Sequence, residues 1–503
     1  MPSPVIIGVV VVYLLFLLVI GVWGGKESHD VKGYYAAGKK LPSWVLAFSS
    51  NATGESAWLL LGLTGIGYAL GMHALWVVLG EVLGVALAWA FVARPFKAFT
   101  DRYGSITVPD YLEDRFRDKT HSFRIVGAVI VLSMVAFYVG AQLTATGKAF
   151  DSFLGTGYGV GVGLGLAVVL FYTVVGGFKA VAYSDFAQGV LMFACLLVLP
   201  FVGIGAVGGW GALMDGLRAA EPLAVFEGLQ ASGPDLLRLG GGLGLTPLGI
   251  ASAAGFVGVG LAFLGAPQLL ARFLAARDQR EIRKAGPIAV GCIIVFDLGA
   301  VFTGMAARVL YPALADPETA LPAMAAGLLP DLFTGLVLVV VLAAIMSTAD
   351  SLLILASSAA VRDVYQKIFR PDARQRALSV LGKAVTVVLG VTGLLLALTA
   401  ERAIFWFVLF AWSGLAAAFA PVVLCSLFWA RTTRAGALAG MIAGFLVTML
   451  WVVLFKEGFY DLYEMLPGFA AGFAVTIGVS LFTQPPDGAA EELAAIREEV
   501  RRA

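Results

Sequence analysis

The sequence predicts an all-α polytopic membrane protein with about thirteen transmembrane helices. The chain has 503 residues, of which 60% are hydrophobic and only 13% are Asp, Glu, Lys or Arg, against about 25% charged residues in soluble domains. Apolar runs of about 20 residues, the length that crosses the core of a bilayer, recur along almost the whole chain. Soluble domains cannot bury so many apolar side chains, so the composition excludes them. The net charge of +1 gives no overall field that would attract nucleic acid.

Thirteen apolar runs are long enough to be spanning helices. No basic segment precedes the first run, and this run is too long for the core of a signal peptide, so we predict a spanning helix there as well. The predicted spans cover residues 3–24, 43–71, 74–96, 123–147, 158–175, 181–208, 244–270, 285–307, 332–358, 380–400, 403–428, 435–455 and 466–483.

Lys and Arg residues are unevenly distributed between the loops that join these spans. When alternate loops are assigned to opposite sides, 28 of the 34 Lys and Arg residues fall on one side, together with the C-terminal tail. The positive-inside rule makes that side cytoplasmic, which places the C-terminus inside and the N-terminus outside the inner membrane. Termini on opposite sides agree with an odd number of spans. Residues 1–483 are predicted as one transmembrane domain and 484–503 as a cytoplasmic tail.

Two of the spans contain sequences that interrupt a helix. In span 43–71 the central segment Ser49–Ser56 is polar, and in span 244–270 four glycines precede Pro267. Lipid offers no hydrogen-bond partners, so such segments indicate broken helices that line a cavity inside the protein. A pair of interrupted spans in corresponding positions is typical of transporters built from inverted repeats.

The distance between the interrupted spans defines the predicted repeats. They lie five spans apart, which gives one repeat at about residues 43–208 and a second at about 244–428. Because five is an odd number, the two repeats have opposite topology in the membrane. One helix is left over before the first repeat and two follow the second.

Acidic side chains within the spans are the main candidates for functional groups, because a buried charge is costly unless it is compensated. Few basic residues are predicted at comparable depth, which favours cations or protons as partners. Two of the acids have no supporting motif and are interpreted as protonated or helix-bridging structural groups, namely Glu81 and Asp297. The full set is Glu55, Glu81, Asp185, Asp297 and Asp350.

Asp350 lies beside a row of small and hydroxyl-bearing residues. Ala344, Ser347, Thr348 and Ser351 follow the spacing of one helix face. Hard cations prefer several oxygen ligands, so two hydroxyls together with carbonyls from the interrupted span 43–71 would suit Na⁺. The alternative is that these hydroxyls only bond to carbonyls of their own helix.

Several long motifs resemble the sodium:solute symporter family, and within it the sodium/proline symporters. The similarity runs over about residues 5–483 and implies thirteen helices around a LeuT-like five-plus-five inverted repeat. The motifs are GYYAAGKKLPSW (33–44), ITVPDYLEDRF (106–116), FYTVVGGFKAVAYSDFAQ (171–188), GAPQLLARFLAA (265–276), LAAIMSTADSLL (342–353) and FAWSGLAAAFAPVVLCSLFWARTTRAGALAGMIAG (410–444).

The resemblance implies a set of ion ligands. The sodium site of the family maps onto the carbonyls of Ala52, Glu55 and Ala344 and the hydroxyls of Ser347 and Thr348. Some members of the family bind a second sodium ion through an acid that matches Asp185, and the side chains facing that acid would be those of Ser347, Asp350 and Ser351.

The chain departs from the proline symporters at three positions. Gly54 replaces an Asp that serves sodium-coupled transport in that family, and the acid is displaced by one residue to Glu55. In the implied solute site, Val259 and Phe263 replace a Trp and a Tyr. Two hydrogen-bond donors are thereby lost from the predicted pocket. The solute-binding residues expected here are Ser56, Trp58, Val259, Phe263, Pro267 and Trp412.

The sequence thus predicts a secondary symporter that imports a small organic solute with Na⁺ by alternating access. L-proline is the best single candidate for the solute, and a monocarboxylate, another amino acid or a sugar acid stays open. The sequence also does not exclude proton coupling through Glu55, a non-transporting solute sensor or an intramembrane enzyme using Asp185 and Asp350. Na⁺, the solute and the bilayer are the only partners expected, with no cofactor and no obligate protein partner.

Overall fold

The computed structural model describes residues 3–25, 31–221, 223, 236–241, 245–399 and 404–502. Within these ranges the chain is helical, and the only β-type pairing is an isolated bridge between Leu41 and Ala276. Residue 244, where the second predicted repeat begins, and residues 400–403, where two predicted spans meet, lie outside the described residues. The all-α prediction is confirmed.

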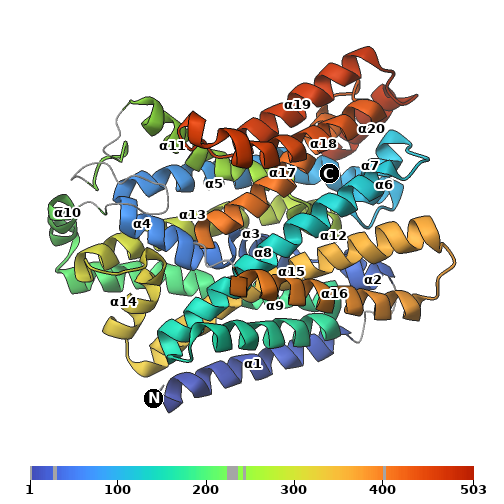
Figure 1. Cartoon of the computed structure of the whole chain (residues 1–503). Helices are drawn as coiled ribbons and strands as arrows, with labels where there is room; N and C mark the ends of the chain where they lie inside the picture. The colour runs from blue at the N-terminus through green and yellow to red at the C-terminus, as the bar shows by residue number, and fades with distance from the viewer. Residues whose placement is uncertain are drawn as a thin grey trace.

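The long helices run roughly alongside one another through the molecule (Figure 1). The first half of the chain forms α1 (Pro4–Gly25), α2 (Val31–Ala36), η1 (Ala37–Lys39), α3 (Ser43–Ala57), η2 (Trp58–Leu63), α4 (Thr64–Leu70), η3 (Gly71–Ala74), α5 (Leu75–Leu87), η4 (Ala88–Val92), α6 (Ala93–Tyr103), α7 (Val108–Phe116), α8 (Ser122–Leu154), α9 (Tyr158–Val207) and α10 (Trp210–Ala219). The second half forms α11 (Pro247–Gly258), η5 (Val259–Leu264), α12 (Pro267–Ala275), α13 (Gln279–Leu310), η6 (Pro317–Thr319), α14 (Ala320–Leu328), α15 (Asp331–Ser357), η7 (Ser358–Phe369), α16 (Gln375–Thr399), α17 (Ile404–Phe428), α18 (Arg434–Leu450), η8 (Trp451–Phe455), η9 (Glu457–Phe459), α19 (Met465–Phe482) and α20 (Ala489–Arg502).

Eleven helical stretches of the described chain are long and apolar enough to cross a membrane. One of them, Ser43–Tyr103, contains two predicted spans, which are separated where Gly71 takes a φ of 56°. The predicted span 158–175 corresponds to the shorter apolar helix Tyr158–Phe171, which a non-helical Gly177 divides from the rest of α9. Helix therefore occupies the predicted spans, but length and hydropathy alone do not establish the count of thirteen.

Both predicted interruptions are present, and both are shorter than expected. In α3 the break falls at Ser56 alone, with φ 54° and ψ −164°, while residues 49–55 remain helical. The second break lies at Gly265, with φ −170° and ψ 11°, between η5 and α12. The polar centre of the first span is thus helical up to Glu55, and Asp185 on α9 accepts hydrogen bonds from Ser49 and Thr53 without any unwinding of the backbone.

The interrupted helix α3 lies at the centre of the bundle, where it contacts α9, α13 and α15. α15 also packs against α8 and against α1, which lies at the lower edge of the view in Figure 1. At the opposite edge α18 and α19 pack together on α17, and the terminal helix α20 covers α6. The polar residues of α3 therefore face protein on several sides, as the predicted central site requires.

The segments flanking the two interrupted helices are joined by backbone hydrogen bonds. The Leu41 N–H donates to the carbonyl of Ala275 at 3.1 Å, and the Arg277 N–H donates to the carbonyl of Leu41 at 3.0 Å. Beside them, the Ser43 N–H donates to Glu281 Oε2 at 2.6 Å. The start of α3 is therefore fixed to the end of α12 and the start of α13.

A close backbone contact between α5 and η5 yields a prediction about stability. A Cβ added at Gly260 would collide with the carbonyl of Gly80, which is backbone and cannot rotate away. We expect Gly260→Ala to destabilise the protein by about 1–3 kcal/mol or more, seen as a lower thermal unfolding temperature of the purified chain. The matched change Gly163→Ala meets nothing within 4 Å and should leave that temperature unchanged; an equal response of both variants would contradict the contact.

Candidate functional site

Two hydroxyls of α15 meet the backbone of the interrupted helix α3. Ser347 Oγ donates to the carbonyl of Ala52 at 3.0 Å and to the carbonyl of Ala344 on its own helix at 3.0 Å. Thr348 Oγ1 donates to the carbonyl of Thr53 at 3.0 Å. All of these residues are buried. The hydroxyls thus bridge two helices, and the alternative in which they bond only within α15 is wrong.

Four of the five residues predicted for the sodium site are joined by these bonds: Ala52, Ala344, Ser347 and Thr348. The carbonyl of Thr53, which was not predicted, is part of the same group. The carbonyl of Glu55 instead accepts the N–H of Trp58 just beyond the break in α3. The result is a compact set of carbonyl and hydroxyl oxygens, the ligand type that Na⁺ requires.

Asp185 on α9 lies in a second polar group, as predicted. Its Oδ2 accepts hydrogen bonds from Ser49 Oγ at 2.8 Å and from Thr53 Oγ1 at 3.3 Å. Thr53 also lies 3.3 Å from Ser351 Oγ, and Ser351 Oγ donates to Asp350 Oδ1 at 3.2 Å. The structure therefore brings together three of the four residues expected at a second sodium ion, namely Asp185, Asp350 and Ser351.

An arginine just beyond the predicted span 244–270, and hence in a predicted cytoplasmic loop, lies in the middle of this second group. Arg272 on α12 is fully buried, and its Nη2 donates to Asp185 Oδ2 at 3.0 Å, to Thr53 Oγ1 at 2.6 Å and to Ser351 Oγ. Its guanidinium carbon lies 5.1 Å from the centre of the Phe178 ring. The expectation of few bases at the depth of the acids is wrong here, because the break at Gly265 lets α12 return into the bundle.

A small cavity of about 30 Å³ borders Arg272, which forms an ion pair with Asp185. It is lined by Pro267, Gln268 and Arg272 of α12, by Ser351 of α15 and by Asp363 of η7, among other residues. A space of this size holds about one water molecule. Pro267, expected at the solute site, therefore lies on this cavity at the start of α12.

Aromatic side chains close the region between the two interrupted helices. The rings of Phe263 and Trp412 meet edge to face at 5.5 Å, and Trp412 Nε1 donates to the carbonyl of Val259 at 3.3 Å. A Cβ at Gly54 would lie 2.9 Å from Phe263 Cε1. Phe263 thus fills the space that a side chain at position 54 would need.

The remaining predicted solute residues lie at the break in α3. Ser56 Oγ accepts the N–H of Trp58 at 3.2 Å. Tyr138 of α8 stacks edge to face on Trp412 at 6.3 Å, and Gln142 Oε1, one turn further along α8, accepts the N–H of Ala57 at 3.2 Å. The amide nitrogen of Gln142 is buried without a hydrogen-bond partner among the described residues. Sequence reasoning missed α8 because one Tyr and one Gln in an apolar helix give no recognisable pattern.

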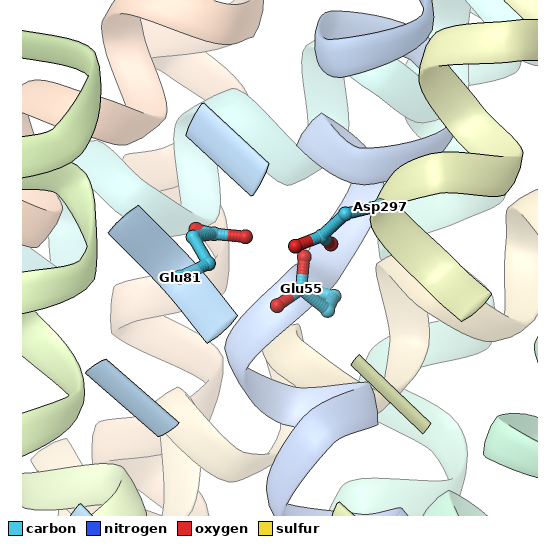
Figure 2. A group of neighbouring side chains, drawn as sticks. All are labelled: Glu55, Glu81 and Asp297. Carbon is cyan, nitrogen blue, oxygen red and sulfur yellow. The ribbon is translucent and has the colours of Figure 1, made fainter. Parts of the chain in front are cut away.

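Glu55 belongs to a third polar group, which contains the two acids without a motif. Figure 2 shows the carboxylates of Glu55 on α3 and Asp297 on α13 facing one another, with the carboxylate of Glu81 on α5 directed toward them. One oxygen from each side chain lies within 4.8 Å of the others, and all three residues are buried. Glu81 and Asp297, interpreted from the sequence as protonated or helix-bridging structural groups, thus come from two different helices and meet at Glu55.

Comparison with known sequences gives a match over most of the chain. The model of the "Sodium:solute symporter family" matches residues 34–444. The "High-affinity proline transporter PutP" of Bacillus subtilis is 36% identical over 481 residues, covering 94% of this chain and 97% of the relative. The "Sodium/proline symporter" of Staphylococcus aureus is 32% identical over 510 residues, covering 98% of this chain and 96% of the relative.

Solved structures show the same architecture. A Na⁺-coupled sialic acid symporter in a substrate-bound outward-open state has a TM-score of 0.78 at 18% identity, covering 96% of this chain and 99% of that one. MhsT, solved in complex with L-phenylalanine, has a TM-score of 0.53 at 17% identity, covering 87% and 98%. These similarities confirm the expected LeuT-like fold. Together with the match over residues 34–444, they place this chain in the sodium:solute symporter family.

Proposed function

We propose that the protein is a Na⁺-coupled symporter that imports a small organic solute across the plasma membrane, with L-proline as the first candidate. The observation that carries this proposal is the contact of the Ser347 and Thr348 hydroxyls with the carbonyls of the interrupted helix α3. Relatives with more than 30% identity over nearly the whole chain bear the name of proline transporters, which supports the choice of solute.

The sodium ion binds between α3 and α15 in this proposal. The hydroxyls of Ser347 and Thr348 donate their protons to carbonyl oxygens, and the lone pairs of the hydroxyl oxygens can coordinate an ion once the hydroxyls rotate. The carbonyls of Ala52, Thr53 and Ala344 supply further oxygens. Because both α3 and α15 contribute ligands, a bound ion draws the two helices together, and the membrane potential adds about 2.3 kcal/mol per charge and 100 mV to inward transport.

Arg272 takes the place of an ion in the second polar group in this conformation. Its guanidinium contacts Asp185, Thr53 and Ser351, the atoms that a second sodium ion would need. An arginine remains charged at all physiological pH values, so in this conformation Arg272 compensates the buried carboxylate of Asp185 whatever the pH. A sodium ion can bind beside Asp185 only after Arg272 has moved away.

The solute occupies the region enclosed by the break in α3, η5, α8 and Trp412. The rings of Phe263, Trp412 and Tyr138 offer an apolar surface that suits a pyrrolidine ring. The unpartnered amide nitrogen of Gln142 is a donor for a carboxylate. This arrangement recognises the ring and the carboxylate of an imino acid. It does so without the two hydrogen-bond donors that are lost at Val259 and Phe263.

The topology proposed for the membrane follows from the charge distribution. The tail helix α20 packs on α6, on the side of the molecule that carries most Lys and Arg residues. Figure 1 shows the N-terminus toward the other end of the long helices. An outside N-terminus and a cytoplasmic C-terminus agree with the positive-inside rule.

Uptake of labelled L-proline into proteoliposomes tests the function. An inward Na⁺ gradient should drive accumulation, and an equal concentration of K⁺ should not. Competition by unlabelled amino acids, monocarboxylates and sugar acids identifies the solute if proline fails. Saturable solute binding without uptake would contradict the symporter and favour a sensor, and accumulation driven equally well by a proton gradient without Na⁺ would contradict sodium coupling.

Gln142 should determine solute affinity. We expect Gln142→Met, which keeps the length of the side chain but removes both its donor and the oxygen that accepts the Ala57 N–H, to raise the proline concentration for half-maximal uptake about tenfold or more, because hydrogen bonds to charged groups contribute about 1.5–3 kcal/mol. Ser133 on the same helix bonds only to its own backbone, so Ser133→Ala serves as the control. Unchanged proline affinity in Gln142→Met would exclude this residue from the solute site.

A further inference from the structure

The carboxylates of Glu55, Glu81 and Asp297 form an acidic triad at the junction of α3, α5 and α13 (Figure 2). Each residue is at most 1% exposed. Both carboxylate oxygens of Glu55, both of Asp297 and one of Glu81 have no hydrogen-bond partner among the described residues. Buried oxygens of this kind are rarely left without a donor or a positive charge, so the triad is incomplete without a ligand.

The surroundings of the triad provide no compensating charge. No lysine, arginine or histidine of the described chain pairs with any of its three members. The other ionisable side chains that interact with the triad are neutral hydroxyls and a thiol, from Tyr138 of α8, Cys292 of α13 and Tyr463. Three negative charges within 4.8 Å of one another would repel strongly at this depth. A bound cation would relieve this repulsion.

The spacing of the carboxylates is suited to a cation of moderate size. Three atoms that are at most 4.8 Å apart share a point within about 2.8 Å of each of them, close to the range of about 2.3–2.6 Å that calcium, a cation of similar size to Na⁺, shows to oxygen. Magnesium needs about 2.0–2.1 Å and keeps most of its water, so it fits a dry site poorly. Hard carboxylate oxygens also disfavour soft transition metals.

A neutral oxygen lies on the same face of α3. Asn51 precedes Glu55 by one helical turn, and its Nδ2 donates to the carbonyl of Ala289 on α13 at 2.7 Å. This bond fixes the amide, while its oxygen Oδ1 stays buried without a partner. The buried interface between α3 and α13 thus presents unsatisfied acceptors over more than one turn, as expected of a site for a cation.

We propose that Glu55, Glu81 and Asp297 bind a Na⁺ ion that is distinct from the ion held by Ser347 and Thr348. The proposal rests on the proposed function, in which Na⁺ is the ion available to the transport cycle. Glu55 lies on α3 three residues after Ala52, whose carbonyl belongs to the first site. One short helical segment therefore takes part in both sites, so that occupancy of one site alters the geometry of the other, and reciprocally.

Equilibrium binding of radioactive ²²Na⁺ to the purified full-length chain, with no solute present, tests the site directly. We expect Glu81→Gln and Asp297→Asn, which keep size and remove charge, each to bind one Na⁺ fewer per chain than the wild type or to bind it at least about tenfold more weakly. Glu464→Gln removes an equally buried carboxylate that is paired with Lys456 outside the triad, and it should retain the wild-type count.

A second variant keeps the test decisive if the triad variants do not fold. In Ser347→Ala/Thr348→Ala the first site is removed, and one Na⁺ per chain should still bind if the triad is a site. The absence of residual binding would overturn the proposal, as would an unchanged Na⁺ count in both triad variants. Displacement of ²²Na⁺ by micromolar Ca²⁺, or loss of proline affinity with the Na⁺ count intact, would assign the triad to another ligand. Each of these outcomes is independent of whether Na⁺ drives proline uptake.

Discussion

Replacing Thr348 with alanine is expected to raise the Na⁺ concentration for half-maximal proline uptake by about tenfold or more, and Ser347→Ala should do the same. Each substitution removes a hydroxyl that lies 3.0 Å from a carbonyl of α3, and a tenfold change corresponds to about 1.4 kcal/mol of binding free energy. Both side chains are buried, so water cannot easily replace the lost oxygen. The measurement is initial uptake in proteoliposomes as a function of external Na⁺.

The matched substitution Thr348→Ser separates the loss of a ligand from the loss of packing. It keeps the hydroxyl and removes one methyl group, so Na⁺ affinity should stay near that of the wild type. Proline affinity at saturating Na⁺ should be affected little in all of these variants, because the hydroxyls bond to carbonyls of α3 and α15 and not to a residue of the proposed solute site. If Na⁺ dependence is the same in both alanine variants and in the wild type, the ion binds elsewhere.

Removing the charge of Arg272 should destabilise the protein more than any of the substitutions named above. In Arg272→Gln the carboxylate of Asp185 would stay buried without its ion-pair partner, and breaking a buried pair on one side costs about 3–5 kcal/mol. Thermal unfolding of the purified chain in detergent provides the measurement. Transport should also decline, since Arg272 links α12 to α3, α9 and α15 through Thr53, Asp185 and Ser351.

The double variant Arg272→Gln/Asp185→Asn decides whether the charge is responsible. Neither buried partner then carries a charge, so much of the lost stability should return. Added Na⁺ should raise the unfolding temperature of Arg272→Gln more than that of the wild type, because an ion can enter the space beside Asp185 once the guanidinium is gone. A double variant less stable than Arg272→Gln, with no effect of Na⁺ on either, would contradict this role of the ion pair.

Much of the fold could be predicted because hydropathy is a local property. The spans, the two interruptions and the hydroxyl face of α15 all follow from residues that are neighbours in sequence or along one helix. The extent of the break in α3 could not be read in this way. The polar side chains of Ser49, Asn51 and Thr53 suggested unwinding, but Asp185, Arg272 and the carbonyl of Ala289 give Ser49, Thr53 and the amide nitrogen of Asn51 partners within an intact helix.

The residues that sequence reasoning missed depend on how distant segments meet. Arg272 appeared to begin a cytoplasmic cluster of basic residues, and only the turn at Gly265 shows that α12 lies beside α3. Glu81 and Asp297 are separated by more than 200 residues from each other and have no common motif with Glu55. Their convergence follows from the packing of α5 and α13 around α3, which no pattern within a single helix reveals.

The hydrogen bonds that join Leu41 to Ala275 and Arg277 have a mechanical consequence. They connect the segment that enters α3 with the segment that leaves α12, and the contact of Ser43 with Glu281 reinforces the connection. The segment of α3 before Ser56 and the helix α12 after Gly265 are consequently coupled as one unit, with a hinge at Ser56 and a second hinge at Gly265. We therefore expect both interrupted helices to tilt together, so that ion binding beside α3 shifts α12 through these hydrogen bonds.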